Sequence, residues 1–336
     1  MRALNVLTWH VHGNYLFYLS HVPHRFYLPV KEGRPEGYGG RLPGLPWPEN
    51  VVDVPADEVR DLDLDLILFQ SRKNYVEDRA ILSDAQDGLP RIYLEHDPPR
   101  ESPTDTRHPF DEPNGLLVHV TAFNALMWDN GRTPTRVIEH GVSVPDDVRY
   151  TGEIERGLVV VNGLPRRGRR LGADVLEAVR AKIPLDVVGI GSEAIGGLGE
   201  IGHDELPYVM ARHRFLFNPI RYTSLGLAVC EAMSVGMPIV ALATTEMATV
   251  VENGVSGYAD TRVDALVEHM RRLLDEPGEA ARLGAGARRT AARRFTTRRF
   301  VRDWSAAFEH AAQRAHAESV GSRARKEADR SCLESR

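Results

Sequence analysis

The chain has 336 residues, a length typical of two domains of ordinary size. Its hydrophobic content of 42% and charged content of 26% are typical of a globular protein. A net charge of −5 argues against general nucleic-acid binding, because proteins that bind nucleic acids usually carry a basic excess. Cys230 lies in an apolar helical pattern and Cys332 in a polar tail, so neither a disulfide framework nor a zinc cluster is indicated.

The first half of the chain alternates apolar runs of strand length with helical patterns, which is typical of parallel α/β sheets. Gly- and Pro-rich residues 31–48 predict a long loop, and polar residues 144–156 predict a linker. No small-residue cleavage site follows the N-terminus, and no segment approaches the ~18 apolar residues of a membrane-spanning helix. We therefore expect a cytoplasmic protein. Strands are predicted at 3–9, 25–30, 50–55, 64–70, 91–96, 116–121 and 135–141.

The second half repeats this alternation, so we predict two doubly wound, Rossmann-like domains in tandem. The first spans residues 1–150 and the second 151–298; a helix at 299–315 and a disordered tail at 316–336 follow. Strands are predicted at 158–163, 185–191, 214–219 and 238–244. Helices are predicted at 172–182, 205–213 and 225–236, and Ala- and Arg-rich residues 279–310 are also helical in pattern.

Glu231 is a single carboxylate in the otherwise apolar helical stretch LGLAVCEAMSVG. Buried carboxylates need a partner. The stretch follows a strand, so the first amides of its helix, from Ser224 to Leu227, are suited to an anion. A carboxylate two turns further can accept two hydroxyls, such as those of a nucleotide's ribose. The alternative is a glutamate that faces solvent or pairs with a nearby arginine.

The same stretch resembles the donor-site signature of the retaining glycosyltransferases of GT-B fold, the GT4 or group 1 family. The resemblance covers most of residues 155–260 and, more weakly, 90–145. It implies a donor site for a nucleotide diphosphate sugar, a last helix that returns to the first domain, and no metal or other cofactor. The matching residues are Pro219, Gly226, Leu227, Glu231, Ala232, Met233, Gly236, Pro238 and Val240.

By resemblance, the arginine-rich loop PRRGRR binds the diphosphate, with Arg166 and Arg170 preferred; a solvated basic turn is the alternative. His96, after the strand RIYLEH, is the catalytic candidate and would hydrogen-bond the transferred sugar; the alternative is a structural cap. Gly13 would let the substrates approach the first strand, or is an ordinary turn glycine. The remaining donor-binding candidates are Arg221, Thr223, Ser224, Leu225, Gly226, Leu227 and Glu231.

Several positions depart from the family pattern, among them Leu225, which replaces an aromatic residue, and Thr245-Glu246, which replace two glycines. The glutamate that contacts the donor sugar in the family is Thr223 here, and a later family glutamate is Thr249. These departures leave the donor sugar open. They also motivate a different class of function, a nucleotide-sugar-binding protein without catalysis.

Three further patterns are weaker signals of chemistry. The Asp-x-Asp pattern at 61–65 resembles a metal motif of another glycosyltransferase architecture, but it precedes its strand and is rejected. His10 and His12 have no third ligand nearby and are read as structural residues. The basic segment RRTAARRFTTRRFVRDW is consistent with a peripheral membrane contact, or with arginines that cover a core.

The sequence therefore predicts a metal-independent glycosyltransferase that moves a sugar from a nucleotide diphosphate donor to an unknown acceptor with retention of configuration. That acceptor could be a glycan, a lipid-linked molecule or a small molecule, and nucleic acid is not expected as a partner. An enzyme alternative is a nucleotide-sugar epimerase of the same fold.

Overall fold

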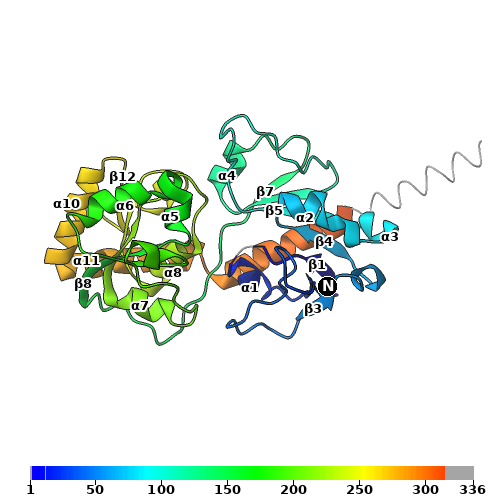
Figure 1. The fold of residues 1–336 in the computed structure, drawn as a ribbon, viewed down its shortest axis with the longest axis horizontal. Coiled ribbons are helices and arrows are strands. Elements are labelled where there is room, and N and C mark those ends of the chain that lie inside the picture. The colour runs from blue at the N-terminus through cyan, green and yellow to red at the C-terminus, as the bar shows by residue number, and fades with distance from the viewer. Residues whose placement is uncertain (1, 12, 315–336) are drawn as a thin grey trace, which may run out of the picture.

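The computed structural model describes residues 2–11 and 13–314, which form two lobes, each built on a parallel sheet (Figure 1). The first sheet has seven strands in the order β3-β2-β1-β4-β5-β6-β7. Its strands are β1 (Asn5–Thr8), β2 (Arg25–Val30), β3 (Val51–Pro55), β4 (Leu66–Phe69), β5 (Arg91–Glu95), β6 (Leu116–His119) and β7 (Thr135–Val137). Its helices are α1 (Tyr15–Leu19), α2 (Arg72–Val76), α3 (Asp84–Asp87) and α4 (Ala122–Met127).

The second sheet has five strands in the order β12-β11-β10-β8-β9. The strands are β8 (Ile154–Val160), β9 (Leu185–Val188), β10 (His213–Asn218), β11 (Ile239–Leu242) and β12 (Gly257–Asp260). The helices are α5 (Leu164–Arg167), α6 (Ala173–Arg180), α7 (Leu206–Arg212), α8 (Leu227–Val235), α9 (Met247–Val250), α10 (Val263–Asp275) and α11 (Pro277–Arg294). The predicted class of two Rossmann-like domains is confirmed.

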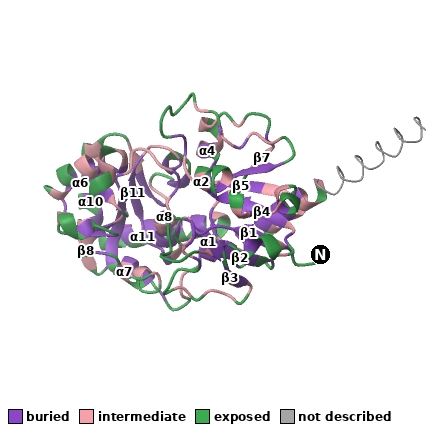
Figure 2. Cartoon of the chain, turned by 45° about the vertical axis from the view of Figure 1, so that its right-hand side comes forward, coloured by how far each residue is buried: buried purple, intermediate pink, exposed green. Residues whose placement is uncertain are grey.

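The central strands of both sheets are buried along their whole length. Every residue of β4, β6, β10 and β11 is buried, as Figure 2 shows for the interior of both lobes. Strands covered by helices on both faces read as continuous apolar runs rather than alternating ones. These four strands could therefore be predicted from their apolar runs in the sequence.

A final helix, residues 297–314, lies against the first sheet although it follows the second in the chain (Figure 1). Phe300, Trp304 and Phe308 recur at every fourth position and are fully buried. The Trp304 indole donates a hydrogen bond to the Tyr15 hydroxyl of α1 at 3.1 Å, and Phe308 packs against Phe26 of β2. Thus the helix ties the end of the chain to the first lobe.

Several boundaries differ from those expected. Helix α11 ends at Arg294, and Phe295 and Thr296 interrupt the pattern predicted as helical over 279–310. Strand β8 begins at Ile154, inside the predicted linker. Strand β12 was not predicted, because GYAD begins with glycine, ends with aspartate and has little β-propensity. The tail predicted at 316–336 lies outside the described residues, and no described helix is long and apolar enough to cross a membrane.

Candidate functional site

The loops that follow β5 and β10 bring the two lobes into contact. The Tyr222 hydroxyl donates to the carbonyl oxygen of Pro99 at 2.9 Å, and the Thr223 hydroxyl lies 3.5 Å from an Asp97 carboxylate oxygen. Both loops leave the carboxyl ends of parallel strands, where ligands of such sheets bind. The candidate site lies at this junction.

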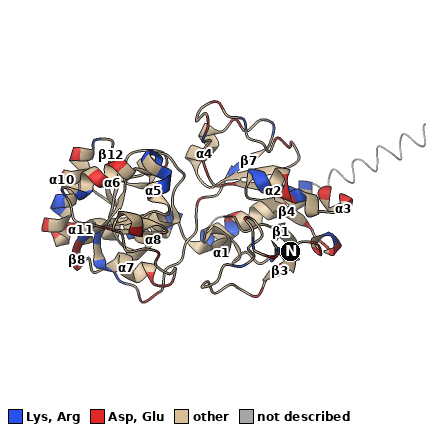
Figure 3. Ribbon diagram, viewed as in Figure 1, with Lys and Arg blue, Asp and Glu red and all other residues tan. Residues whose placement is uncertain are grey.

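Three arginines gather there. Arg167 and Arg170 are partly buried. Burial, followed by the nearby Arg170 guanidinium, lowers the pKa of Arg167; burial, followed by the Arg100 guanidinium, lowers that of Arg170. Within residues 2–11 and 13–314, neither Arg167 nor Arg170 forms an ion pair within 4.0 Å. We call Arg100, Arg167 and Arg170 the arginine cluster; Figure 3 shows basic residues at α5 on the edge facing the other lobe.

The cluster adjoins the start of α8. The backbone amides of Arg221 and Tyr222 donate to the carbonyl oxygen of Arg170 at 3.1 and 3.2 Å, which fixes the two loops together. Helix α8 has no side-chain cap; the Val229 amide bonds the Gly226 carbonyl oxygen, whereas the amides of Leu227 and Ala228 remain available to an anion. The Ser224 hydroxyl, in a residue only 8% exposed, has no hydrogen-bond partner in the described part of the chain. Mutually repelling guanidinium groups, free amides and a buried hydroxyl together favour an anion.

The other donor-binding candidates have different surroundings. The Arg221 guanidinium is held by Asp174 in a two-point ion pair, and the resulting hydrogen bonds lower the pKa of Asp174 to about 2. Leu225 is buried, and its carbonyl oxygen accepts a 2.7 Å hydrogen bond from His140 Nε2. Gly226 is the N-cap of α8 and Leu227 its first residue.

Of the two preferred loop arginines, only one lies in the cluster. Arg166 is exposed, whereas its neighbour Arg167 is partly buried beside Arg170. The loop enters α5 from Gly163 in a left-handed conformation, with φ of 65°, which favours glycine. Arg166 acts electrostatically on Arg167 and Arg170 and stays a prediction, and Arg167 joins it as a further anion-binding candidate.

Glu231 faces a tyrosine of the other lobe. It is 4% exposed, and its Oε1 accepts a 2.8 Å hydrogen bond from the Tyr18 hydroxyl of α1. The His203 ring, which also contacts the Asn14 side chain, lies 4.0 Å from the same carboxylate. Burial raises the pKa of Glu231, and the Tyr18 hydrogen bond offsets this in part. A ligand that uses this carboxylate must therefore share it with Tyr18 or displace that side chain.

A carboxylate whose pKa is raised by folding costs stability at any pH where it is ionised. We expect Glu231→Gln to raise the unfolding temperature of the ligand-free protein at pH 8 by roughly 2–4 °C, the shift that ~1 kcal/mol produces in domains of this size. The gain should shrink as the pH falls toward the ordinary value of 4.5. Glu252→Gln, on the surface, is the control for thermal denaturation across this pH range. A loss of stability at pH 8 would instead make Glu231 a structural residue.

A second buried carboxylate links the lobes. Glu246 is 4% exposed and accepts hydrogen bonds from the Phe123 amide at the start of α4 and from the Thr249 hydroxyl. Arg294 lies 3.8 Å from Glu246 and pairs with Glu139. Thr249, where the family pattern has a glutamate, therefore supports a neighbouring one. For Glu246 the sequence predicted no role beyond its departure from a glycine of the family pattern.

His96 lies directly after β5, and its Nε2 is 3.1 Å from the side-chain oxygen of Gln70. The ring of Tyr15 packs edge-on against it at 4.9 Å. Gly13 lies just before α1 with φ of +32°, a conformation that favours glycine, and its carbonyl oxygen contacts His10 Nε2. Gly13 and His96 thus come from the first lobe, and the arginine cluster mostly from the second.

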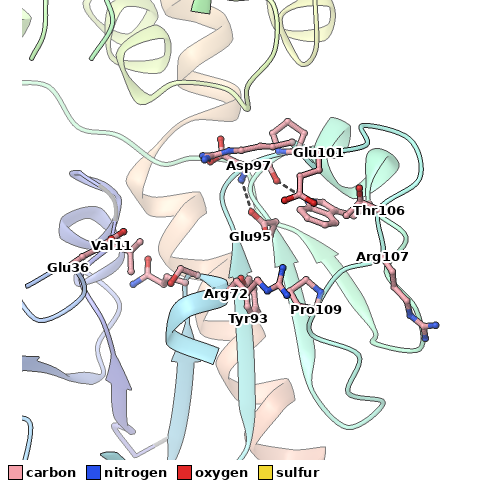
Figure 4. Close-up of a pocket in the computed structure, with 15 residues that line it drawn as sticks. Val11, Glu36, Arg72, Tyr93, Glu95, Asp97, Glu101, Thr106, Arg107 and Pro109 are labelled. Carbon is pink, nitrogen blue, oxygen red and sulfur yellow. Dashed lines mark hydrogen bonds and ion pairs between the residues drawn. The ribbon is translucent and has the colours of Figure 1, made fainter. Parts of the chain in front are cut away.

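A cavity of about 530 Å³ lies at the carboxyl end of β5 in the first lobe, lined by the two chain neighbours of His96 (Figure 4). Glu95 and Asp97 line it at the end of β5, and Figure 4 shows Val11 and Glu36 on one side of them and Thr106 on the other. The Trp128 indole is fixed by a 2.9 Å hydrogen bond to the Asp97 carbonyl oxygen. The remaining lining residues include Gln70, Arg72, Tyr93, Arg100 and Glu101.

The Asp-x-Asp pattern lies at the opposite end of the first sheet. Asp65 directly precedes β4, where its carboxylate accepts the Asn5 amide at 2.8 Å, whereas Gln70 and His96 follow the carboxyl ends of their strands. Across residues 2–11 and 13–314, no three His, Cys, Asp or Glu side chains are grouped as metal ligands.

Comparison with known proteins agrees with this arrangement. The family model described as Glycosyl transferases group 1 matches residues 155–276. Over 79 residues, the chain is 33% identical to the O-antigen chain mannosyltransferase B of Escherichia coli; the match covers 24% of this chain and spans 21% of that protein's length.

Two solved structures share the fold over most of the chain. Sucrose-phosphate synthase of Thermosynechococcus elongatus superposes with a TM-score of 0.66 at 15% identity, covering 92% of this chain and 98% of that one. Anabaena Alr3699/HepE in complex with UDP gives 0.66 at 16% identity, covering 92% and 100%. The chain therefore matches the glycosyl transferases group 1 family model over residues 155–276, and its two lobes together have the GT-B fold.

Proposed function

We propose that the protein is a glycosyltransferase that moves a sugar from a nucleotide diphosphate donor to an acceptor, with retention of configuration and without a metal ion. The observation that carries this proposal is the arginine cluster beside the uncapped start of α8. Arg100 is exposed and pairs with Asp97, whereas Arg167 and Arg170 are partly buried and have no ion-pair partner among residues 2–11 and 13–314. These two guanidinium groups favour an anion, and a diphosphate is suited because guanidinium groups bind its oxygens in pairs. The amides of α8 and the Ser224 hydroxyl supply neutral donors.

The nature of the donor is supported by related structures. Anabaena Alr3699/HepE was solved in complex with UDP and glucose, at a TM-score of 0.65 and 14% identity, covering 91% of this chain and 99% of that one. In this proposal, the diphosphate lies on the arginine cluster. Glu231 accepts the ribose hydroxyls after its hydrogen bond from the Tyr18 hydroxyl is broken or shared. Arginines and amides can then stabilise the charge of the departing diphosphate, which is the role a metal plays elsewhere.

The cavity beside His96 is our candidate for the acceptor site. Asp97 and Arg100 line it, and both act electrostatically on Arg167 and Arg170, so the cavity adjoins the proposed diphosphate site. Carboxylates such as Glu95 and Glu101 can accept hydroxyl hydrogen bonds, and the fixed Trp128 ring offers an apolar face. A hydroxyl-bearing acceptor would therefore meet the donor near His96.

We also propose a peripheral membrane contact through the basic segment at residues 288–304. Arg294 and Arg299 are used internally, by Glu139 and by Asp303, which leaves an exposed set on which binding to acidic lipid would depend. Cosedimentation with anionic vesicles tests this. The exposed arginines are Arg288, Arg289, Arg293, Arg298 and Arg302.

If Glu231 accepts the ribose hydroxyls, we expect Glu231→Ala to weaken nucleotide diphosphate binding by ~1–3 kcal/mol, because hydrogen-bonding groups lose their partner. Calorimetric titration measures this. Ser234→Ala on the same helix is the control, since its hydroxyl bonds only the Cys230 carbonyl oxygen and affinity should not change. Equal affinity in Glu231→Ala and the parent would remove Glu231 from the donor site.

The proposal is tested by donor turnover. UDP-, GDP-, ADP- and dTDP-sugars are incubated with the protein in the presence of EDTA, in water and with an acceptor panel, and release of the nucleoside diphosphate is followed. We expect release from one donor, and a product with the donor's anomeric configuration. Binding without release would favour a non-catalytic nucleotide-sugar-binding protein, and a changed sugar on intact nucleotide an epimerase. Activity lost in EDTA and restored by manganese would contradict metal independence.

A further inference from the structure

Gln70 forms a buried hydrogen-bonded chain across three neighbouring strand ends. It follows β4, Thr8 ends β1 and His96 follows β5, so all three lie at the carboxyl edge of the first sheet. Gln70 is 3% exposed. Its side-chain amide therefore forms its hydrogen bonds with protein groups rather than with water.

The orientation of the Gln70 amide follows from its partners. Its Nε2 donates to the Trp9 carbonyl oxygen at 2.8 Å and to the Thr8 hydroxyl at 2.9 Å. A backbone carbonyl can only accept, and the amide has two N–H groups, so both are used there. The Gln70 oxygen must face His96, because the opposite orientation would set two oxygens against each other.

This arrangement determines the state of the His96 ring. Its Nε2 lies 3.1 Å from the Gln70 oxygen, which can only accept, so Nε2 carries the proton. The Gln70 contact therefore sets the tautomer and the orientation of the ring. The Tyr15 ring, edge-on at 4.9 Å, restricts the imidazole from a second side.

We propose that Gln70 is a positioning residue that fixes the tautomer and orientation of His96 for sugar transfer. This inference rests on the proposed function, because it needs His96 to contact the sugar. Gln70 also lines the acceptor cavity, so it lies between that cavity and His96. A misplacement of His96 by about 1 Å is enough to cost on the order of 100-fold in rate.

The main test replaces the amide by a side chain of similar length, Gln70→Met. We expect the turnover number for UDP-glucose, or for whichever donor the panel selects, to fall about 10–100-fold while nucleotide diphosphate affinity stays within threefold. In a His96→Ala background the same substitution should have little further effect, because two residues acting through one group are not additive. Additive losses, or a Gln70→Met enzyme with unchanged turnover, would overturn the proposal.

The chain offers a matched control in Gln86, which is also buried in the first lobe and donates to two backbone carbonyls, those of Val59 and Leu62. Gln86→Met should lose similar stability but keep its turnover number. Where Gln70→Met does not fold, Thr8→Val removes one acceptor of the amide and should lower turnover several-fold with affinity unchanged. Unchanged turnover in a folded Thr8→Val would count against the proposal in the same way.

A readout without activity separates this inference from the proposed function. In a histidine-selective ¹⁵N spectrum, the His96 Nε2 proton should be protected from exchange, and the protection should be lost in Gln70→Met. His96→Gln assigns the signal. A protected proton in a protein that turns over no donor would sink the proposed function and leave the contact intact; an unprotected one would refute the contact itself.

Discussion

His96→Ala is expected to cut sugar transfer by roughly 100-fold or more while leaving nucleotide diphosphate affinity within about threefold. The asymmetry follows from the position of His96, which lies in the first lobe after β5, whereas Arg167, Arg170 and Glu231 belong to the second. A group that contacts the sugar mainly as it departs stabilises the transition state more than the bound donor. Turnover and calorimetric affinity must be measured on the same preparation.

The control for this variant is His269→Ala, in the second lobe, where the imidazole stacks on Tyr258. It should leave both quantities unchanged. If turnover and affinity fall together in His96→Ala, the residue serves binding or folding. If neither falls, His96 is a structural cap at the end of β5, and the positioning role of Gln70 loses its basis.

Replacing both Arg167 and Arg170 by methionine should weaken donor binding by about 100-fold or more. Each charge-assisted hydrogen bond is worth ~1.5–3 kcal/mol, and 1.4 kcal/mol corresponds to tenfold in affinity. Methionine keeps the apolar part of each side chain, so mainly the charge is removed. Calorimetry with the donor identified by the panel provides the measurement.

Arg169→Met is the matched control for the double variant, because Arg169 lies in the same loop but its side chain is 77% exposed and pairs with Asp174. Its donor affinity should stay within twofold of the parent. Without nucleotide, the double variant should be at least as stable as the parent, because two mutually repelling charges are removed. Destabilisation with unchanged affinity would show that the cluster serves the fold.

The order of elements could be predicted because parallel strands buried on both faces give apolar runs, and Gly236 and Pro238 mark the end of α8 and the start of the next strand. The sequence also placed Glu231 on α8 and His96 after β5. The placement of side chains within short helices and loops could not be predicted from the sequence. Arg167, which was not among the predicted site residues, lies in α5, a helix of four residues that is too short for a periodic signal.

Partners that are distant in the chain could not be predicted. Tyr18 and Glu231 are 213 positions apart, and Phe123 and Glu246 are 123 apart. Each pair forms only because the two lobes meet, and nothing local marks Tyr18 as different from its aromatic neighbours Tyr15 and Phe17 in α1. Glu246 carried a weak signal, since it stands in a family position usually held by glycine, but its contact with α4 depends on the tertiary structure.

The most direct test of the donor site is a thermal-shift panel with UDP-, GDP-, ADP- and dTDP-sugars on the parent protein and on the Arg167→Met, Arg170→Met variant. A ligand at ~100 times its dissociation constant stabilises the folded state by about 2.7 kcal/mol. The account predicts a saturable rise in unfolding temperature with one nucleotide class, lost in the double variant. No shift with any of the four classes at millimolar concentration, or an equal shift in both proteins, would contradict it.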